Sequence, residues 1–420
     1  MLKRILHHFA ARVLTAGLSF AVVWLTARYL GAAGRGAVSL FVTDVSALIL
    51  FSGLVGGSSL IYLVPRRNFW HLLLPAYAWA GVVSVVGAGA VLLLRPVSST
   101  YALHVGAVTL VQILFSINTF LLLGRQRERA FNGLMALQAL LLAGALALAF
   151  GPLHWQAVEV FYYANYLAYG LPLLLSFGLL LRLPDAWVSR RARRRVVARE
   201  LLRNSRGAHL ANILSFANYR LSYYAVAHFA DIRALGILSV GVALAEAIWL
   251  IPRSTGLIQY VALVNAPDKR EQTHAAFRSS RLTLLATLAA VATLAAVPGA
   301  WLAAIFGPEF GAARWVILCL APGILIYGAG MQASTYFGGV GRYGINNRAA
   351  LLGLAVTVPL CFVLVPRWGI EGAAVAMSLS YTASIGYLFW HYCRATGATW
   401  VDLLPGPGDL RWLLAKVRGA

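Results

Sequence analysis

The sequence predicts an all-α polytopic membrane protein with about twelve transmembrane helices in two lobes of six. Of its 420 residues, 60% are apolar or aromatic and only 11% are charged, whereas a soluble globular protein keeps about a quarter of its residues charged. Apolar runs of about 20 residues, the length at which a helix crosses a bilayer, recur from one end of the chain to the other. The composition therefore excludes a soluble enzyme with a large apolar core.

The predicted spans follow one another with mostly short connections that carry turn residues. In the first half, the spans are expected at 9–29, 37–64, 71–94, 101–123, 132–150 and 157–181. In the second half, they are expected at 207–229, 235–264, 282–305, 312–338, 347–365 and 370–393. We therefore expect an N-lobe at 1–181, a basic cytoplasmic linker at 182–206, a C-lobe at 207–393 and a cytoplasmic tail at 394–420.

The distribution of Lys and Arg predicts the orientation, because these residues concentrate in cytoplasmic loops. With the N-terminus inside, the inside segments hold 26 of the 35 basic residues and the outside loops hold 6. The remaining three, Arg12, Arg220 and Arg253, lie within spans. The ratio favours two cytoplasmic termini and an even number of helices, and it accounts for the net charge of +22.

The longest basic run is SRRARRRVVARELLRNSRG at 189–207, with eight arginines and one acid, Glu200. Out of context, it would suggest a nucleic-acid arm. It lies between the two lobes, where the charge distribution predicts the cytoplasm, so we expect no nucleic-acid partner. A short amphipathic helix on anionic membrane lipid is expected from the spacing of Arg191, Arg194, Val197, Leu201 and Leu202.

A weak internal repeat relates the second span of each half at an offset of 200 residues. Gly36, Ser39, Val42, Ala47, Leu50 and Gly56 match Gly236, Ser239, Val242, Ala247, Leu250 and Gly256. Two halves of six helices share one orientation, so the repeat is parallel, with a pseudo-twofold axis along the membrane normal. Substrate sites in such transporters lie between the halves near the middle of the membrane.

Charged residues within the spans are candidates for function, because an unpaired charge in lipid is unfavourable by several kcal/mol. Arg220 lies close to mid-membrane without an acid three or four residues away, and Arg253 follows in the next span. A guanidinium offers a fork of donors that matches phosphate or carboxylate oxygens, so both arginines are candidates for binding an anion. Asp44 and Glu246 are candidate protonation sites or counter-ions. Glu246 and Arg253, seven residues apart on one helical face, could also form a structural pair, or pair with another helix.

Amide and aromatic side chains within the spans suit hydrogen bonding to sugars and stacking against them. The tyrosines among them could equally form an interfacial belt. The candidate sugar path consists of Gln112, Asn118, Tyr162, Tyr163, Asn165, Asn212 and Tyr223.

Motifs for other chemistries are missing from the sequence. It contains no GxxxxGK[ST] phosphate loop, no nucleophile elbow and no HExxH motif, and its three cysteines, Cys319, Cys361 and Cys393, form no CxxC pair. We therefore expect no enzyme activity, no cofactor and no metal. Energy for transport would come from an ion gradient, the membrane potential or consumption of the product.

Three segments resemble the Wzx-type polysaccharide and O-antigen flippases of the multidrug/oligosaccharidyl-lipid/polysaccharide exporter superfamily. Segment 27–67 has the "YLG…G" turn that opens the second helix, and 235–260 resembles the family's eighth helix. Segment 305–390 has the "FGPEF" outer turn, the "G.GR…N" inner turn and the "P.WGI.GAA" outer turn in family order. Together they cover about a third of the chain.

The resemblance implies a two-lobed, alternating-access transporter in the bacterial inner membrane. Its substrate would be an oligosaccharide on undecaprenyl pyrophosphate, moved from the cytoplasmic to the periplasmic leaflet, with a polysaccharide polymerase and glycosyltransferases as partners. Arg220 and Arg253 match the family's cationic cavity residues on helices 7 and 8. The chain lacks the helices 13 and 14 of peptidoglycan-precursor flippases, and its first helix lacks the acid expected of cation-coupled drug exporters. A cation-coupled multidrug antiporter and a non-transporting scaffold subunit are the alternatives.

Overall fold

The computed structural model describes residues 2–185, 191–254, 269–340 and 342–397, and the secondary structure of these residues is helical, without strands. Eight of the described helices are long and apolar enough to cross a bilayer, and a bent pair makes a ninth. Large apolar side chains such as Val85 and Leu174 point outward, as they do in proteins whose surface contacts lipid. The chain divides into two compact units, Met1–Ile213 and Leu214–Ala420.

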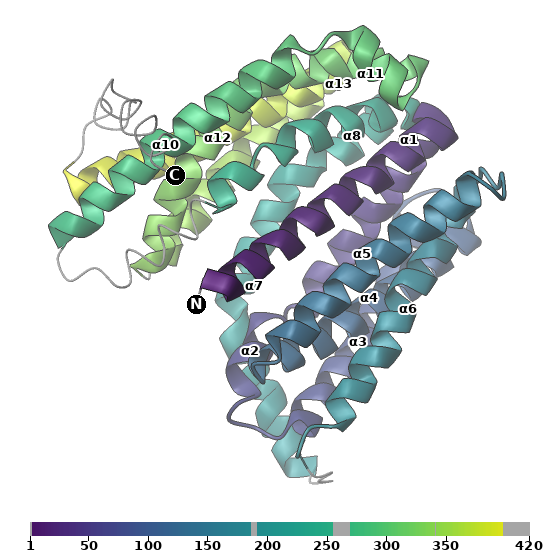
Figure 1. Ribbon diagram of the computed structural model, residues 1–420, viewed down its shortest axis with the longest axis vertical. Helices are drawn as coiled ribbons and strands as arrows, with labels where there is room; N and C mark the ends of the chain where they lie inside the picture. The colour runs from purple at the N-terminus through teal and green to yellow at the C-terminus, as the bar shows by residue number, and fades with distance from the viewer. Residues whose placement is uncertain (1, 186–190, 255–268, 341, 398–420) are drawn as a thin grey trace. The chain divides into compact units, whose positions relative to one another are not determined.

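The first unit is built from helices that lie side by side, α3 against α4, α4 against α6, and α5 against α6 and α1 (Figure 1). Its helices are α1 (Leu2–Ser52), α2 (Ser58–Leu63), α3 (Phe69–Leu94), α4 (Ser99–Gly124), α5 (Glu128–Phe150), α6 (Glu159–Leu181) and the first part of α7 (Arg191–Phe229). Apolar side chains fill the space between α1, α4, α5 and α6, with Val38, Phe41, Leu146 and Phe150 at the centre.

The second unit is centred on α12, which packs against α8, α10 and α13. Besides the end of α7, its helices are α8 (Ile232–Ala247), α10 (Lys269–Ala296), α11 (Gly299–Phe306), the 3-10 helix η1 (Pro308–Ala312), α12 (Ala313–Gly339) and α13 (Tyr343–Thr396). Helices α10 and α11 meet at an angle of 81°, so that the predicted span 282–305 is a bent pair. Pro298 stands at this bend, where its ring prevents α10 from continuing.

Two of the helices each contain two predicted spans. Helix α1 has 51 residues, which at 1.5 Å per residue would extend about 77 Å, more than twice the thickness of the hydrocarbon layer. The chain breaks from helical geometry at Gly31, with φ 66° and ψ −174°. Helix α13, with 54 residues, breaks in the same way at Gly369. The eight apolar helices and the bent pair make nine candidate spans among the described residues. Dividing α1 and α13 at these glycines adds two, and the apolar end of α7 adds one, so the total equals the predicted twelve.

The observed boundaries agree with the predicted ones to within a few residues for most spans. The largest differences lie at 37–64, where a turn at Gly53–Gly57 separates α2 from α1, and at the starts of 207–229 and 282–305, where α7 and α10 begin earlier, at Arg191 and Lys269. The described part of 235–264 is helical to Ser254 except for a turn after Ala247. Most of the predicted tail at 394–420 lies outside the described residues.

The predicted linker is part of a continuous helix, because α7 begins at Arg191 and runs on to Phe229. Leu201 on this helix is fully buried in an apolar cluster of the first unit, together with Leu63 and Val64. Glu200 accepts a hydrogen bond from Arg67 at 2.7 Å. The described end of the linker thus packs on the first unit, and the two units divide further along α7, at Ile213. The side chains of Arg191, Arg194 and Val197 lie outside the described set.

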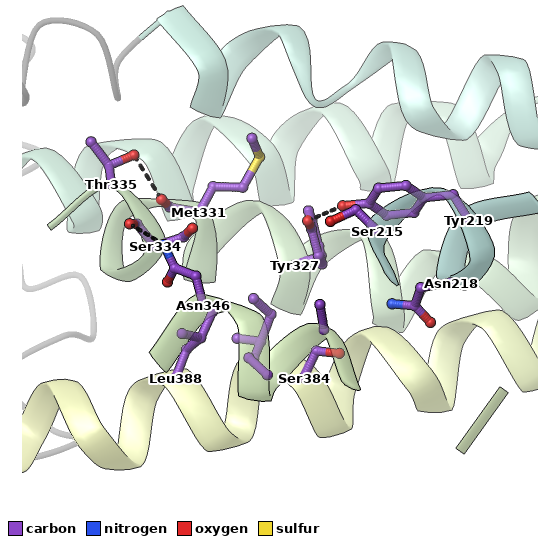
Figure 2. A pocket seen from close by; sticks show the side chains of 13 residues that line it. Ser215, Asn218, Tyr219, Tyr327, Met331, Ser334, Thr335, Asn346, Ser384 and Leu388 are labelled. Atoms are coloured by element: carbon purple, nitrogen blue, oxygen red, sulfur yellow. Dashed lines mark hydrogen bonds between the residues drawn. The ribbon is translucent and has the colours of Figure 1, made fainter. Parts of the chain in front are cut away.

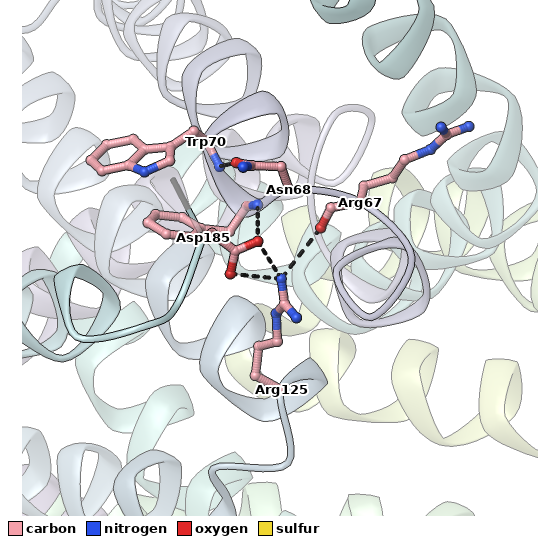
Figure 3. A network of polar contacts seen from close by, with 6 residues as sticks. Arg67, Asn68, Trp70, Arg125 and Asp185 are labelled. Atoms are coloured by element: carbon pink, nitrogen blue, oxygen red, sulfur yellow. Dashed lines mark hydrogen bonds and ion pairs between the residues drawn. The ribbon is translucent and has the colours of Figure 1, made fainter. Parts of the chain in front are cut away.

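A polar cluster fastens the start of the linker to the first unit (Figure 3). The Arg125 guanidinium, at the C-terminus of α4, donates to both carboxylate oxygens of Asp185 at 2.6 and 2.8 Å and to the carbonyl of Arg67 at 3.4 Å. The backbone N–H of Phe69 donates to the same carboxylate at 3.4 Å. Asp185 therefore joins the end of α6 to the turn before α3.

Replacement of Gly31 by Ala tests the break in α1. The backbone at Gly31 occupies a region that residues with a Cβ enter at a cost of about 1–3 kcal/mol, so Gly31→Ala should lower the melting temperature of the purified protein. Gly17→Ala is the matched control, because Gly17 lies inside the helix with no heavy atom near the added Cβ and Ala favours a helix by about 1 kcal/mol. Equal melting temperatures for the two variants would show that Gly31 carries no such constraint.

Candidate functional site

The centre of the candidate site is an ion pair between two helices of the second unit. Arg220 of α7 donates from both terminal nitrogens to the two carboxylate oxygens of Glu246 of α8, each at 3.1 Å. This fork-to-fork geometry uses two of the five guanidinium donors. The side chains are 30% and 18% exposed, so the pair is only partly covered by the protein. The guanidinium also lies over the ring of Tyr223, 5.1 Å from its centroid and one turn further along α7.

The end of α8 positions the acid of this pair. The chain leaves the α-helix after Ala247, and the N–H of Trp249 turns back to the carbonyl of Glu246 at 3.0 Å. Pro252 is the cause in the sequence, because it has no N–H to donate to the carbonyl of Ile248 and its ring crowds that carbonyl. Between Glu246 and Arg253, the turn at Ile248–Trp249 interrupts the α-helical hydrogen bonds, and the chain is helical again from Leu250 to Ser254. The interrupted segment Ile232–Ser254 thus carries both residues.

Four aromatic rings pack beside the ion pair; Trp249 and Tyr381 are buried, and Tyr219 and Tyr327 are half-buried. Tyr219, next to Arg220 on α7, contacts Trp249 in the turn after α8, with ring centroids 5.8 Å apart. The Trp249 ring lies 4.6 Å from that of Tyr327 on α12 and 5.4 Å from that of Tyr381 on α13. The hydroxyls of Tyr219 and Tyr327 are hydrogen-bonded to each other. This cluster connects α7 and the turn after α8 to α12 and α13.

Arg253 differs from Arg220 in its surroundings. Its side chain is exposed, and no carboxylate of the described residues lies within ion-pair distance of it. Because Arg220 and Glu246 neutralise each other, the uncompensated charge of this part of the second unit is the positive charge of Arg253. The three charged residues Arg220, Glu246 and Arg253 thus carry a net charge of +1.

The first unit contains a second ion pair, which neutralises Asp44. This carboxylate is 3% exposed and forms a salt bridge with Arg95, the residue that ends α3. The hydroxyl of Tyr101 donates to the same carboxylate at 2.6 Å. Arg95 is 51 residues away from Asp44 along the chain, so helical spacing in the sequence could not predict this partner.

The amide residues of the predicted sugar path are hydrogen-bonded within the first unit. Gln112 donates to Asn165 at 3.2 Å, linking α4 to α6. Asn118 accepts from the hydroxyl of Tyr77 at 2.7 Å and donates to Ser176 at 3.0 Å. Asn118 is fully buried, and Asn165 is almost so. In this conformation these amides connect helices α3, α4 and α6.

The other predicted sugar-path residues lie in different environments. Tyr162 is buried against the ring of Phe41, with centroids 4.2 Å apart. Tyr163 is exposed beside Trp155. Asn212 is exposed on α7 in the first unit, whereas Tyr223 is buried in the second unit beneath Arg220. No group of three His, Cys, Asp or Glu that could hold a metal ion occurs in the described part of the chain.

Comparison with known proteins shows which class of protein has this fold. No family model matches the chain. The chain is 12% identical to the lipid II flippase MurJ in its inward closed conformation, with a TM-score of 0.73 over 93% of this chain and 87% of that one. An inward-facing multidrug resistance MATE transporter of the MOP superfamily gives 14% identity and a TM-score of 0.70 over 91% and 94% of the two chains. A MOP superfamily transporter from Pyrococcus furiosus, described as having a binding pocket of reverse polarity, gives 15% identity and a TM-score of 0.65 over 93% and 94%.

A curated relative gives a shorter match. The chain is 28% identical over 93 residues to the capsular polysaccharide biosynthesis protein CapF of Staphylococcus aureus, and the match spans 22% of this chain and about a quarter (24%) of that one. The solved structures define the class: the chain is a multi-pass membrane protein with the fold of the MOP superfamily transporters.

A double-mutant cycle on Arg220 and Glu246 tests whether their pairing stabilises the second unit. Removing either partner leaves a charge without compensation, so Arg220→Ala and Glu246→Ala should each destabilise by about 3–5 kcal/mol, and the double variant by less than the sum. Arg233 and Glu309, with side chains 61% and 31% exposed and a separation of 2.6 Å, form the control pair, with an expected coupling below about 1 kcal/mol. Unfolding in detergent measures both couplings, and equal values would contradict the assignment.

Proposed function

We propose that this protein is a flippase for a polyprenyl-pyrophosphate-linked oligosaccharide. It moves this lipid from the cytoplasmic to the periplasmic leaflet of a bacterial inner membrane, with both termini in the cytoplasm, for the synthesis of cell-surface polysaccharide. The fold shared with a lipid II flippase and the segment shared with a capsular polysaccharide biosynthesis protein support this assignment. The observation that carries it is the charge of the site, in which the acid is paired and the cation Arg253 is exposed.

The geometry suggests an order of events for the pyrophosphate. Arg253 attracts the anion first, because its guanidinium is exposed and its charge is uncompensated within the described spans. Arg220 still has donors that Glu246 does not use, and a phosphate oxygen matches the guanidinium fork as well as a carboxylate does. Binding of the anion by Arg220 would thus compete with Glu246.

The paired acids have a counter-charge role in this scheme. A carboxylate that loses its cation in a low-dielectric environment is neutralised by a proton, so displacement of Glu246 from Arg220 would couple substrate binding to proton uptake. Asp44 remains paired with Arg95 in the first unit and would balance charge there. Tyr163 and Asn212, which are exposed, would contact the sugars in this conformation. The other members of the predicted sugar path would do so only in a conformation that breaks their present packing; they are Gln112, Asn118, Asn165, Tyr162 and Tyr223.

The shared fold also supports a cation-coupled multidrug antiporter as a second candidate, because a MATE transporter has a TM-score of 0.70 with this chain. Binding of a cationic drug needs an accessible carboxylate. Both candidate acids, Asp44 and Glu246, form ion pairs with arginines, which favours the flippase over the antiporter.

Binding of the substrate by Arg253 can be measured directly. The protein in lipid nanodiscs is titrated with a polyprenyl-pyrophosphate-linked oligosaccharide, and Arg253→Gln should weaken binding by about 10- to 100-fold, since bonds to charged groups contribute about 1.5–3 kcal/mol. Arg367→Gln, which removes an exposed arginine from α13 near Gly369, should bind like the wild type. Unchanged binding by Arg253→Gln would contradict the role of Arg253 in holding the pyrophosphate. Tighter binding of a cationic dye than of the lipid would argue for the antiporter.

Synthesis of the surface polymer in cells tests the role of Arg220. Arg220→Ala should abolish the polymer, and so should the double variant Arg220→Ala, Glu246→Ala, which contains no unpaired acid at this position. Immunoblots of the membrane fraction show whether each variant is present at the wild-type level. Full restoration of the polymer in the double variant would mean that Arg220 acts only as a structural partner of Glu246.

A further inference from the structure

A separate cavity lies within the second unit, between α7, α12 and α13. Its volume is about 180 Å³, and Figure 2 shows the side chains that surround it. This volume is below the range of about 300–1,000 Å³ that is usual for drug-sized ligands, so the cavity suits one small ring and excludes a lipid chain or a whole oligosaccharide.

The lining is polar but carries no formal charge. Hydroxyl groups come from Ser215 and Tyr219 on α7, from Tyr327, Ser334 and Thr335 on α12, and from Ser384 on α13, and amides come from Asn218 and Asn346. The described residues of the lining include no Asp, Glu, Lys, Arg or His. Met331, Ile385 and Leu388 add apolar surface. A ligand that fits this surface has several neutral hydroxyl or amide groups around an otherwise apolar ring.

Two polar atoms of the lining have no hydrogen-bond partner among the described residues. The hydroxyl of Ser384 is one of them, on a side chain that is only 4% exposed, and the Oδ1 atom of Asn346 is the other. The Nδ2 atom of Asn346 is held by the carbonyl of Ser334 at 3.1 Å, which fixes the direction of the amide (Figure 2). A ligand with hydroxyl groups would satisfy both atoms, because a hydroxyl can donate to an amide oxygen and can either donate to a serine hydroxyl or accept from it.

The wall behind Ser384 is ordered by a network of hydrogen bonds. Asn218 accepts from Thr357 at 2.8 Å and from Ser380 at 2.5 Å, and Ser380 also donates to the carbonyl of Gly353 at 2.9 Å. A Cβ at Gly353 would lie 2.1 Å from the hydroxyl of Ser384, so only glycine permits this close approach. The wall is therefore preorganised.

We propose that this cavity is a subsite for one neutral sugar ring of the transported glycan. The ring hydroxyls would donate to Ser384 and to Oδ1 of Asn346, and the apolar face of the ring would lie against Met331 and Leu388. The assignment of the glycan as its source rests on the proposed flippase function, but the chemistry of the cavity does not. A phosphate does not fit, because the lining offers it no cation.

Free monosaccharides test the subsite without the lipid. Glucose, galactose and N-acetylglucosamine are each added at millimolar concentration to the purified protein in nanodiscs, and saturation-transfer NMR measures binding. At least one sugar should bind, and inorganic pyrophosphate should not compete with it. Ser384→Ala and Asn346→Leu should each weaken that binding about three- to tenfold, the effect of losing one hydrogen bond. Thr293→Val, an isosteric change on the exposed face of α10, should leave it unchanged.

The outcomes separate this inference from the proposed function. Absence of binding by all three sugars, or equal binding by wild type, Ser384→Ala and Asn346→Leu, would overturn the subsite while leaving translocation of the lipid-linked glycan intact. Sugar binding that these two variants weaken, in a protein that fails to move the glycan lipid, would support the subsite and refute the flippase. Melting temperatures of the variants within a few degrees of wild type exclude misfolding as the cause.

Discussion

A charge placed inside a bilayer has to be paired or solvated, and this requirement determines the arrangement of the polar groups in both units. In the first unit, Asp44 is joined to Arg95 and Tyr101, and in the second, Glu246 is joined to Arg220. Each pair connects two different helices, α1 with the end of α3 in the first unit and α7 with α8 in the second. Among the described charges in the spans of the second unit, Arg253 has no carboxylate partner, and the proposed preference for anions depends on its charge.

Breaks in the helices bring these groups into position. Pro252 interrupts the span after Ala247, so that Glu246 lies in the last turn of α8 and Trp249 can join the aromatic cluster. The backbone groups freed by such a break must be bonded inside the protein, because lipid offers them no partner. The carbonyl of Ile248, to which Pro252 has no N–H to donate, accepts instead from the N–H of Ile251 at 3.1 Å. The interruption is thereby accommodated within the core of the second unit.

The fold could be predicted from the sequence because hydropathy and turn residues report directly on transmembrane helices. The spans at 71–94 and 157–181 agree closely with α3 and α6, and Gly31 and Gly369 lie at the turns that divide α1 and α13. The partners of the charges could not be predicted, because Arg220 and Glu246 are 26 residues apart on different helices and helical spacing reveals only neighbours on one helix. The aromatic cluster and the neutral cavity likewise arise from tertiary packing of α7, α12 and α13. A tyrosine next to the central arginine, Tyr219, was the only local signal for them.

The most direct test of the central claim is the movement of the lipid between leaflets. Purified protein is reconstituted into liposomes that contain a polyprenyl-pyrophosphate-linked oligosaccharide, and a membrane-impermeant glycan-modifying enzyme reports how fast the inner pool becomes accessible. The flippase account predicts rapid access with the wild-type protein, slow access with Arg253→Gln and none beyond background in protein-free liposomes. Access at the background rate with folded wild-type protein, under an imposed ion gradient or membrane potential as well as without one, would contradict the account.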